Sequence, residues 1–198
     1  MKTIKIKIKG VCPLIMHNGQ LADRKCIYVQ EIKKINAKKK NRTDEDFDRL
    51  ERLEWEGGLW LHEGAPCLPP DSIHACVIEG ARKTKSGKKA TAGVWCDEPA
   101  RLVFEGPQPK QGTETTIPLR ELDKLYAEPR FVDSRGCKVQ RARIMRTRPI
   151  FRTWSATIEL TYDPKQVDEG DLREWVTTAG AEVGMGDYRP RFGRFVVE

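Results

Sequence analysis

Strict alternation of apolar and charged residues opens the chain and predicts a β-strand over residues 3–9. Ile4, Ile6 and Ile8 fall on one face of this strand, and lysines fall on the other. We therefore expect a sheet that buries one face. Residues 13–19 are predicted to begin as a short strand and to end as a turn, because a proline and a glycine bound them.

Two helical patterns follow. Three isoleucines predict a helix over residues 27–40, which ends in a lysine-rich run. Thr43 and the three acids after it predict the start of a second helix, because acids are favourable at the positive end of the helix dipole. The glycine pair at 57–58 ends it, so the two helices form a hairpin with a basic arm and an acidic arm. The side chains predicted to face inward are Ile27, Ile32, Ile35, Phe47, Leu50, Leu53 and Trp55.

Shorter elements are predicted in the middle of the chain. Residues 59–61 and 65–68 form a strand pair. Residues 69–72 mark the entry of a helix that continues to about Lys83, since proline fits the first helical turn. The remaining segments are predicted as a basic loop at 84–89, a strand at 100–104, and a loop with short elements over 106–135.

The last third of the chain predicts a closing unit of strand, helix, loop and strand. Residues 138–148 alternate weakly until Pro149, which is expected to interrupt them, and residues 150–162 form a long strand or a strand pair. A helix follows over residues 172–183. A glycine-rich segment, residues 184–195, then leads into the last strand. The helix buries Leu172, Trp175, Val176, Ala179 and Val183.

Charge is concentrated in one stretch of the chain. A length of 198 residues fits one domain, and the formal net charge is +7. Residues 134–158 contain no acid and carry all of this net charge, which favours an anionic partner such as nucleic acid. The alternative is a solvated basic face, or ion pairs with the acidic helix at 44–56. The positive residues are Arg135, Lys138, Arg141, Arg143, Arg146, Arg148 and Arg152.

The cysteines and histidines predict neither a disulfide framework nor a metal site. The six cysteines are scattered, and no apolar run of signal-peptide or transmembrane length is present, so reduced thiols in a cytoplasmic protein are expected, with no membrane contact. His62, Cys67, His74 and Cys76 lack the paired spacing of zinc ligands. No dinucleotide or phosphate-loop fingerprint occurs either, so no cofactor is expected.

The glycine-rich segment combines several residue types suited to a nucleic-acid strand. Its glycines permit tight turns, its arginines offer forked donors to phosphate, and its aromatic rings offer stacking faces. We expect Tyr188, Arg189 and Arg191 to contact a ligand and Phe195 to lie in the core. The alternative is a structural turn whose arginines form surface ion pairs.

Catalysis is a second possibility. Asp23, or His17 close to it, would assist in-line cleavage of RNA through a metal or water. A helix cap or a solvated acid is the favoured role for Asp23, because a single carboxylate without a second acidic ligand is weak evidence for metal-assisted cleavage.

Two segments resemble the RAMP superfamily. Residues 68–82, Leu-Pro-Pro-Asp-Ser-Ile-His-Ala-Cys-Val-Ile-Glu-Gly-Ala-Arg, look like its I-P-G-S-S-L-K-G-x-x-R strand-to-helix segment, and residues 184–195 look like its glycine-rich loop. The order of elements is closest to the backbone subunits of CRISPR effector complexes. The resemblance implies an α+β fold over residues 1–198, with an RRM-like (ferredoxin-like) antiparallel sheet. It also implies a helical insertion at 24–58 and a basic, thumb-like β-hairpin at 133–152.

Together these features predict a non-catalytic protein that binds single-stranded RNA or DNA. The resemblance implies side-by-side assembly along the strand as a homo-oligomer or helical filament, with other CRISPR-type subunits as further partners. A free-standing relative in a mobile element or bacteriophage, an RNA endonuclease, and a mimic that caps or inhibits a CRISPR complex are the alternatives. The residues expected to bind nucleic acid are Arg141, Arg143, Arg146, Arg148 and Arg152 on the hairpin, Tyr188, Arg189 and Arg191 on the loop, and Lys83, Lys85, Lys88 and Lys89 as an outer rim.

Overall fold

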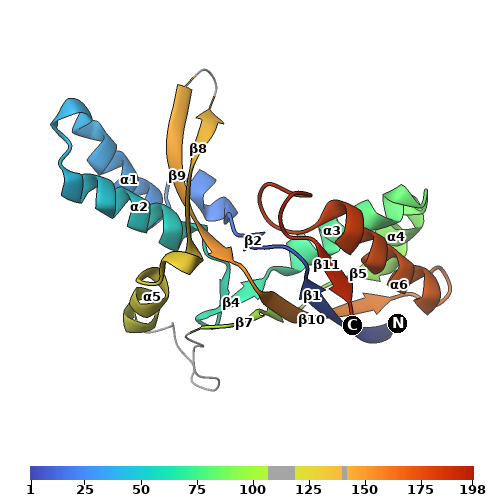
Figure 1. Ribbon diagram of the computed structural model, residues 1–198. Helices are drawn as coiled ribbons and strands as arrows, with labels where there is room; N and C mark the ends of the chain where they lie inside the picture. The colour runs from blue at the N-terminus through green and yellow to red at the C-terminus, as the bar shows by residue number, and fades with distance from the viewer. Residues whose placement is uncertain (107–118, 140–141) are drawn as a thin grey trace.

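The computed structural model describes residues 1–106, 119–139 and 142–198 of the chain (Figure 1). An antiparallel β-sheet carries helices on one face. A helical hairpin and a β-hairpin project from one end of this sheet. The fold is therefore of the mixed α+β class.

The main sheet has the strand order β11-β1-β10-β5, and β7 also pairs with β10. Every pairing in this sheet is antiparallel. Its strands are β1 (Lys2–Gly10), β5 (Val94–Trp95), β7 (Val103–Phe104), β10 (Trp154–Tyr162) and β11 (Phe195–Val197).

The alternation in β1 confirms the predicted strand. Ile6 and Ile8 are almost fully buried, whereas Lys5 and Lys7 point to the other face. On that face Lys7 forms an ion pair of 2.6 Å with Glu198, at the end of the neighbouring strand. The sheet thus buries one face and exposes a charged one.

Helices α3 (Pro70–Lys83), α4 (Gly87–Gly93) and α6 (Glu169–Thr178) lie together on one side of the main sheet (Figure 1). The helix entry predicted at residues 69–72 is confirmed, since α3 begins at Pro70. The predicted loop at 84–89 is wrong from Gly87 onward, because Ala90 is buried and α4 packs on α3. A π-helical turn, η4 (Ala179–Val183), continues α6 into the glycine-rich segment.

The predicted helical hairpin is confirmed. It consists of α1 (Ile27–Ala37) and α2 (Asp44–Gly58), with 3-10 turns η1 (Gly19–Ala22) and η2 (Lys39–Asn41). A capping box starts α2: Thr43 Oγ1 accepts a hydrogen bond from the Asp46 amide at 3.3 Å, and the Asp46 carboxylate accepts one from the Thr43 amide at 3.1 Å. These contacts satisfy amide groups that the first turn leaves unpaired.

Two residues predicted to face inward on this hairpin are exposed. Ile27 is 69% exposed because it lies about 140° around the helix from Ile32, on the side that no element covers. Phe47 is 48% exposed, and the Arg42 guanidinium lies 5.0 Å from its ring centre.

The β-hairpin consists of β8 (Val132–Val139) and β9 (Ala142–Phe151), and β2 (Leu14–Ile15) pairs with the base of β9. The expectation that Pro149 interrupts the strand is wrong. The Pro149 carbonyl accepts a hydrogen bond from the Met16 amide at 3.0 Å, so its nitrogen also faces that side, beyond the end of β2. The missing N–H therefore breaks no bond between β8 and β9.

The remaining elements close the molecule beneath the two hairpins. They are β3 (Leu61–His62), β4 (Ala65–Leu68), β6 (Ala100–Arg101), α5 (Leu119–Tyr126) and η3 (Pro129–Phe131). The strand predicted at 100–104 is split, because β6 pairs with β4 whereas β7 pairs with β10. No helix in the described part of the chain combines the length and apolar character needed to cross a bilayer.

Candidate nucleic-acid interface

The glycine-rich segment is held against the strand region around β2 by its own backbone. The Gly193 amide donates to the Pro13 carbonyl at 2.8 Å, and the Asp187 amide donates to the Ile15 carbonyl at 2.9 Å. Within the segment, the Met185 amide donates to the Gly193 carbonyl at 2.9 Å. The segment is therefore an ordered loop with a fixed position on the molecule.

Two glycines in this loop are required by its backbone conformation. Gly186 and Gly193 have φ values of 77° and 73°, in the left-handed region. A Cβ at Gly186 would lie 2.3 Å from the Ile15 carbonyl oxygen, and one at Gly193 would lie 1.7 Å from the Met185 carbonyl oxygen. The close approach that these glycines permit is to the protein's own main chain.

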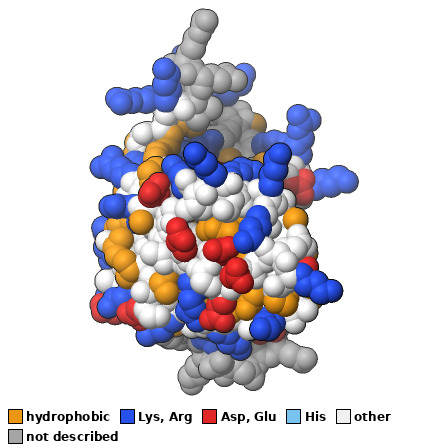
Figure 2. Space-filling view, turned by 90° about the vertical axis from the view of Figure 1, so that its right-hand side faces the viewer, with side chains coloured by type: hydrophobic (Ala, Val, Ile, Leu, Met, Phe, Trp, Pro, Cys, Tyr) orange, Lys and Arg blue, Asp and Glu red, His pale blue; other side chains and the backbone are white. Residues whose placement is uncertain are grey.

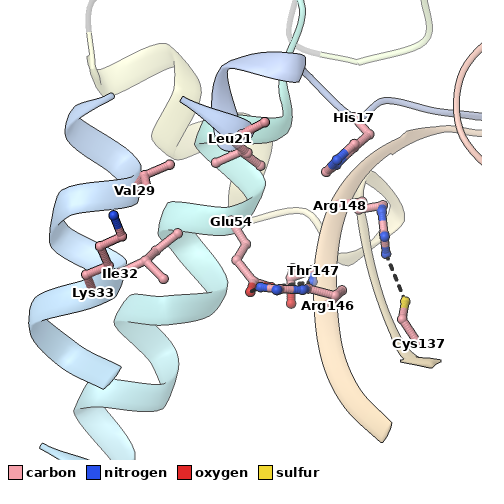
Figure 3. Close-up of a pocket in the computed structure, with 11 residues that line it drawn as sticks. His17, Leu21, Val29, Ile32, Lys33, Glu54, Cys137, Arg146, Thr147 and Arg148 are labelled. Atoms are coloured by element: carbon pink, nitrogen blue, oxygen red, sulfur yellow. Dashed lines mark hydrogen bonds and ion pairs between the residues drawn. The ribbon is translucent and has the colours of Figure 1, made fainter. Parts of the chain in front are cut away.

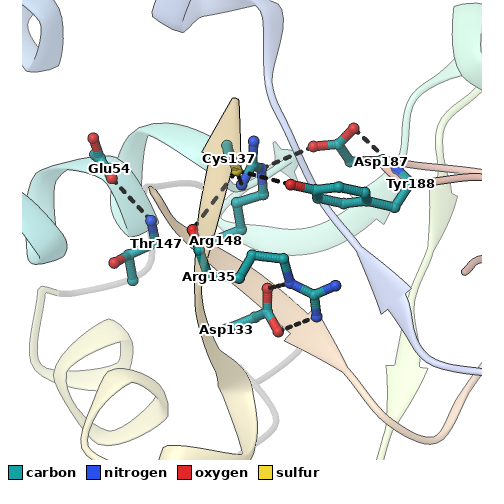
Figure 4. A network of polar contacts seen from close by, with 8 residues as sticks. All are labelled: Glu54, Asp133, Arg135, Cys137, Thr147, Arg148, Asp187 and Tyr188. Carbon is teal, nitrogen blue, oxygen red and sulfur yellow. Dashed lines mark hydrogen bonds and ion pairs between the residues drawn. The ribbon is translucent and has the colours of Figure 1, made fainter. Parts of the chain in front are cut away.

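Tyr188 joins the loop to the β-hairpin (Figure 4). Its hydroxyl lies 2.8 Å from the Cys137 sulfur on β8, and the Arg148 guanidinium on β9 lies 5.3 Å from its ring centre. Arg148 Nη1 also donates to the Cys137 sulfur at 3.3 Å. Side chains from two strands and the loop thus form one cluster.

The electrostatics of this cluster favour a thiolate at Cys137. Burial tends to raise the pKa of the Cys137 thiol, but hydrogen bonds from Tyr188 and Arg148 outweigh burial and lower it. The hydrogen bond to Cys137 in turn raises the pKa of the Tyr188 hydroxyl, so the phenol keeps its proton and acts as a donor.

Several arginines of the hairpin are neutralised by carboxylates within the protein. Arg135 pairs with Asp133 on the same strand, and Arg148 Nε lies 2.8 Å from Asp187 Oδ2 on the glycine-rich loop. Arg146 pairs with Glu54 of α2. The alternative of internal ion pairs, including pairs with the acidic helix, therefore holds for this part of the basic stretch.

Strand geometry also separates the arginines that were predicted to act together. Arg146 and Arg148 lie on the same face of β9, and alternation places Arg143 on the opposite face. Arg141 lies outside the described residues. Arg152 follows the end of β9 and is exposed.

Some exposed cations of the hairpin and the loop have no carboxylate within ion-pair distance among the described residues. Lys138 and Arg143 are opposite one another in the register, close to the end of the hairpin. Arg189 and Arg191 flank Pro190 in the loop, next to the partly exposed Tyr188 ring. We call Lys138, Arg143, Arg189 and Arg191 the free cation set.

The lysines predicted as an outer rim lie elsewhere. They belong to α3, α4 and the turn between them, on the side of the molecule away from the β-hairpin (Figure 1). Lys83 pairs with Glu182 at 3.7 Å, and Lys89 pairs with Asp171 at 2.5 Å. Figure 2 looks at this side and shows acidic side chains gathered in its centre, with Lys and Arg around them. The surface there is mixed in charge and does not continue the hairpin.

Asp23 takes part in a local turn, and His17 lines a cavity. The exposed Asp23 carboxylate accepts a hydrogen bond from the Lys25 amide at 2.9 Å in the turn before α1, whose N-cap is Cys26, so Asp23 is a solvated loop acid and not the N-cap of α1. Burial lowers the pKa of His17, and the Arg148 charge lowers it further, so the ring is neutral at pH 7. No cluster of three or more potential metal ligands occurs among the described residues.

Two groups that shape this site had no signal in the sequence. Cys137 stands two residues after Arg135 on the same face of β8, but its partner Tyr188 is 51 residues away. Asp187 is adjacent to Tyr188, and only the fold brings it to Arg148. Local spacing carries no information about either contact.

Comparison with known proteins does not assign the chain to a family. No protein-family model matches the chain, and no curated protein shows significant similarity to it.

Proposed function

We propose that this protein binds single-stranded nucleic acid, most readily RNA, without cleaving it, and that copies assemble side by side along the strand. The observation that carries the proposal is the free cation set. It lies on the β-hairpin and the glycine-rich loop, where neighbouring arginines are paired internally. Exposed arginines and lysines without internal partners can each neutralise a phosphate, and the adjacent Tyr188 ring provides a stacking face.

The arrangement of the sheet supports an RRM-like fold within the α+β class. Between the central strand β1 and the edge strand β5 the chain forms α3 and α4 after the helical hairpin and the short strands, and between the central strand β10 and the edge strand β11 it forms α6. Two such split βαβ units are the pattern expected of a ferredoxin-like domain. On this basis, and on the resemblance of residues 68–82 and 184–195, we propose a relationship to the RAMP superfamily and to its backbone subunits.

The test is fluorescence anisotropy with a labelled single-stranded RNA, a DNA of the same sequence, and the duplex. The variant Arg189→Ala/Arg191→Ala removes two of the free cations. If each contacts one phosphate, the slope of log K against log salt becomes shallower by about 1.4, and binding at about 0.1 M salt weakens about 25-fold.

The matched control is Arg82→Ala/Arg173→Ala, which removes the same charge from exposed positions on α3 and α6. We expect the control to bind within about twofold of the wild type, because Arg82 and Arg173 lie on the helical side. Equal losses in the two variants would mean that only net charge matters and would refute the assigned surface. Absence of binding at low salt would refute the function and leave a protein-partner role.

A further inference from the structure

A cavity of about 470 Å³ lies between the helical hairpin and the β-hairpin. Figure 3 shows that α1 and α2 form one side and that β8 and β9 form the other. Its volume is within the range typical of sites for small molecules or for one nucleotide. Nothing in the proposed phosphate contacts uses this cavity.

The α1 side of the cavity is an apolar wall. Val29 and Ile32 of α1 and Leu21 of η1 contribute to it, and all three are only half-buried. Partly exposed aliphatic side chains that line a concave surface can bury further area against a flat apolar group. Ile27 belongs to the same helix but does not line the cavity.

The β-hairpin side of the cavity is polar and cationic. Arg146 and Arg148 lie there with His17, and Lys33 stands at the α1 edge (Figure 3). Glu54 is the only carboxylate that lines this cavity among the described residues, and it is bonded to Arg146 and to the Thr147 amide. Arg146 is paired with Glu54 and Arg148 with Asp187, so Lys33 is the lining cation without a carboxylate partner among the described residues, and its charge favours an anionic ligand.

One guanidinium nitrogen on this wall has no partner among the described residues. Arg148 is largely buried, and its Nε lies 2.8 Å from Asp187 Oδ2, so Nε is taken by the ion pair. Its Nη1 is used by Cys137, and no contact of Nη2 is recorded among the described residues. The neutral His17 ring offers one donor and one acceptor, as a base edge requires.

We infer that this cavity takes one nucleotide of the bound strand, with its base against the Leu21, Val29 and Ile32 wall and its phosphate toward Arg148 and Lys33. The inference rests on the proposed function. A flat apolar ring joined to an anion matches one apolar wall and one cationic wall. Arg148 also connects the cavity to the proposed strand surface, because the same guanidinium lies 5.3 Å from the Tyr188 ring centre.

The experiment compares an oligouridine of about 20 nucleotides, longer than common single-strand site sizes, with an abasic ribose-phosphate strand of equal length. Wild-type protein is expected to bind the oligouridine at least about fivefold more tightly, as burial of one base against the apolar wall would produce. The variants Val29→Phe and Ile32→Phe, made separately, fill the cavity and should reduce this ratio at least about threefold. Ile27→Phe, on the exposed side of the same helix, is the matched control and should leave the ratio unchanged.

The outcomes separate this inference from the proposed function. Failure of the wild type to bind either strand overturns both. Normal binding with the same ratio in the wild type and both filled variants overturns the nucleotide pocket alone. Titration with free uridine monophosphate shows whether the cavity takes a nucleotide of the bound strand or a free mononucleotide. If the filled variants bind free uridine monophosphate more weakly while their affinity ratio of oligouridine to abasic strand equals that of the wild type, the cavity binds a free mononucleotide, and the inference is overturned.

Discussion

Glu54 holds the helical hairpin to the β-hairpin, and its replacement should loosen this junction measurably. Its carboxylate accepts a hydrogen bond from the Thr147 amide at 2.8 Å and pairs with the Arg146 guanidinium. Thr147 is only 2% exposed, so its amide relies on this carboxylate as a hydrogen-bond partner. The perturbations are Glu54→Ala, which removes both contacts, and Glu54→Gln, which keeps an acceptor oxygen but removes the charge.

The expected magnitudes follow from burial. An unpaired buried amide costs about 1–3 kcal/mol. The pair with Arg146 adds only up to about 1 kcal/mol, because that side chain is 40% exposed. Glu54→Ala should therefore lower the free energy of unfolding by about 2–3 kcal/mol, and Glu54→Gln by about 1 kcal/mol. For a chain of this size these losses correspond to falls in Tm of about 4–12 °C and about 2–4 °C.

Circular dichroism melting gives the two shifts, and hydrogen exchange of the Thr147 amide localises them. Exchange at this amide should accelerate in Glu54→Ala by at least about tenfold. Glu31→Ala is the control, because Glu31 forms an exposed pair with Lys34 on the neighbouring helix and should change stability by less than about 0.5 kcal/mol. Equal Tm values for the wild type and both Glu54 variants, with unchanged exchange at Thr147, would refute the reasoning.

Two further predictions concern the glycine-rich loop and its cysteine partner. Gly193→Ala should destabilise the fold by more than about 3 kcal/mol, measured by denaturant unfolding, because its φ is 73° and its Cβ would lie 1.7 Å from the Met185 carbonyl oxygen. Cys137 should react with iodoacetamide faster than Cys76 at pH 7, because its pKa is lowered whereas burial raises the pKa of Cys76 to about 12. The Cys137 rate should rise with pH through a midpoint below that of an ordinary thiol, and Arg148→Met should move this midpoint upward.

Each of these predictions has a control in the same chain. Gly170→Ala on α6 meets nothing within 4 Å and should leave stability within about 0.5 kcal/mol of the wild type. Equal unfolding free energies for Gly193→Ala and Gly170→Ala would contradict the close-contact explanation. Peptide-resolved mass spectrometry assigns the cysteine rates. A Cys137 rate that does not change in Arg148→Met would show that the guanidinium has no effect on the thiol.

Much of the secondary structure could be predicted because its causes are local. The period of two in β1, the capping box at Thr43 and the proline at the first turn of α3 act between residues a few positions apart. Errors occurred where a partner from elsewhere decided the outcome. Residues 87–89 became helical because α4 packs on α3, and Pro149 stayed within β9 because its nitrogen faces away from β8, on the side beyond the end of β2.

The candidate site was predicted only as a set of residue types. The sequence by itself determined that the basic charge is concentrated between residues 134 and 158 and that three arginines stand in the glycine-rich segment. It also determined, through the period of a strand, that neighbouring arginines alternate between two faces.

Only the tertiary structure decided which of these cations remain free. Arg146 is paired with Glu54, 92 residues earlier in the chain, whereas Arg189 and Arg191 have no carboxylate partner among the described residues. The same folding enclosed the cavity between two hairpins that are distant in sequence. The physical reason is separation along the sequence. A hydrophobic period depends on residues a few positions apart, whereas these ion pairs and this cavity are formed by residues that are distant in sequence and close in the folded structure.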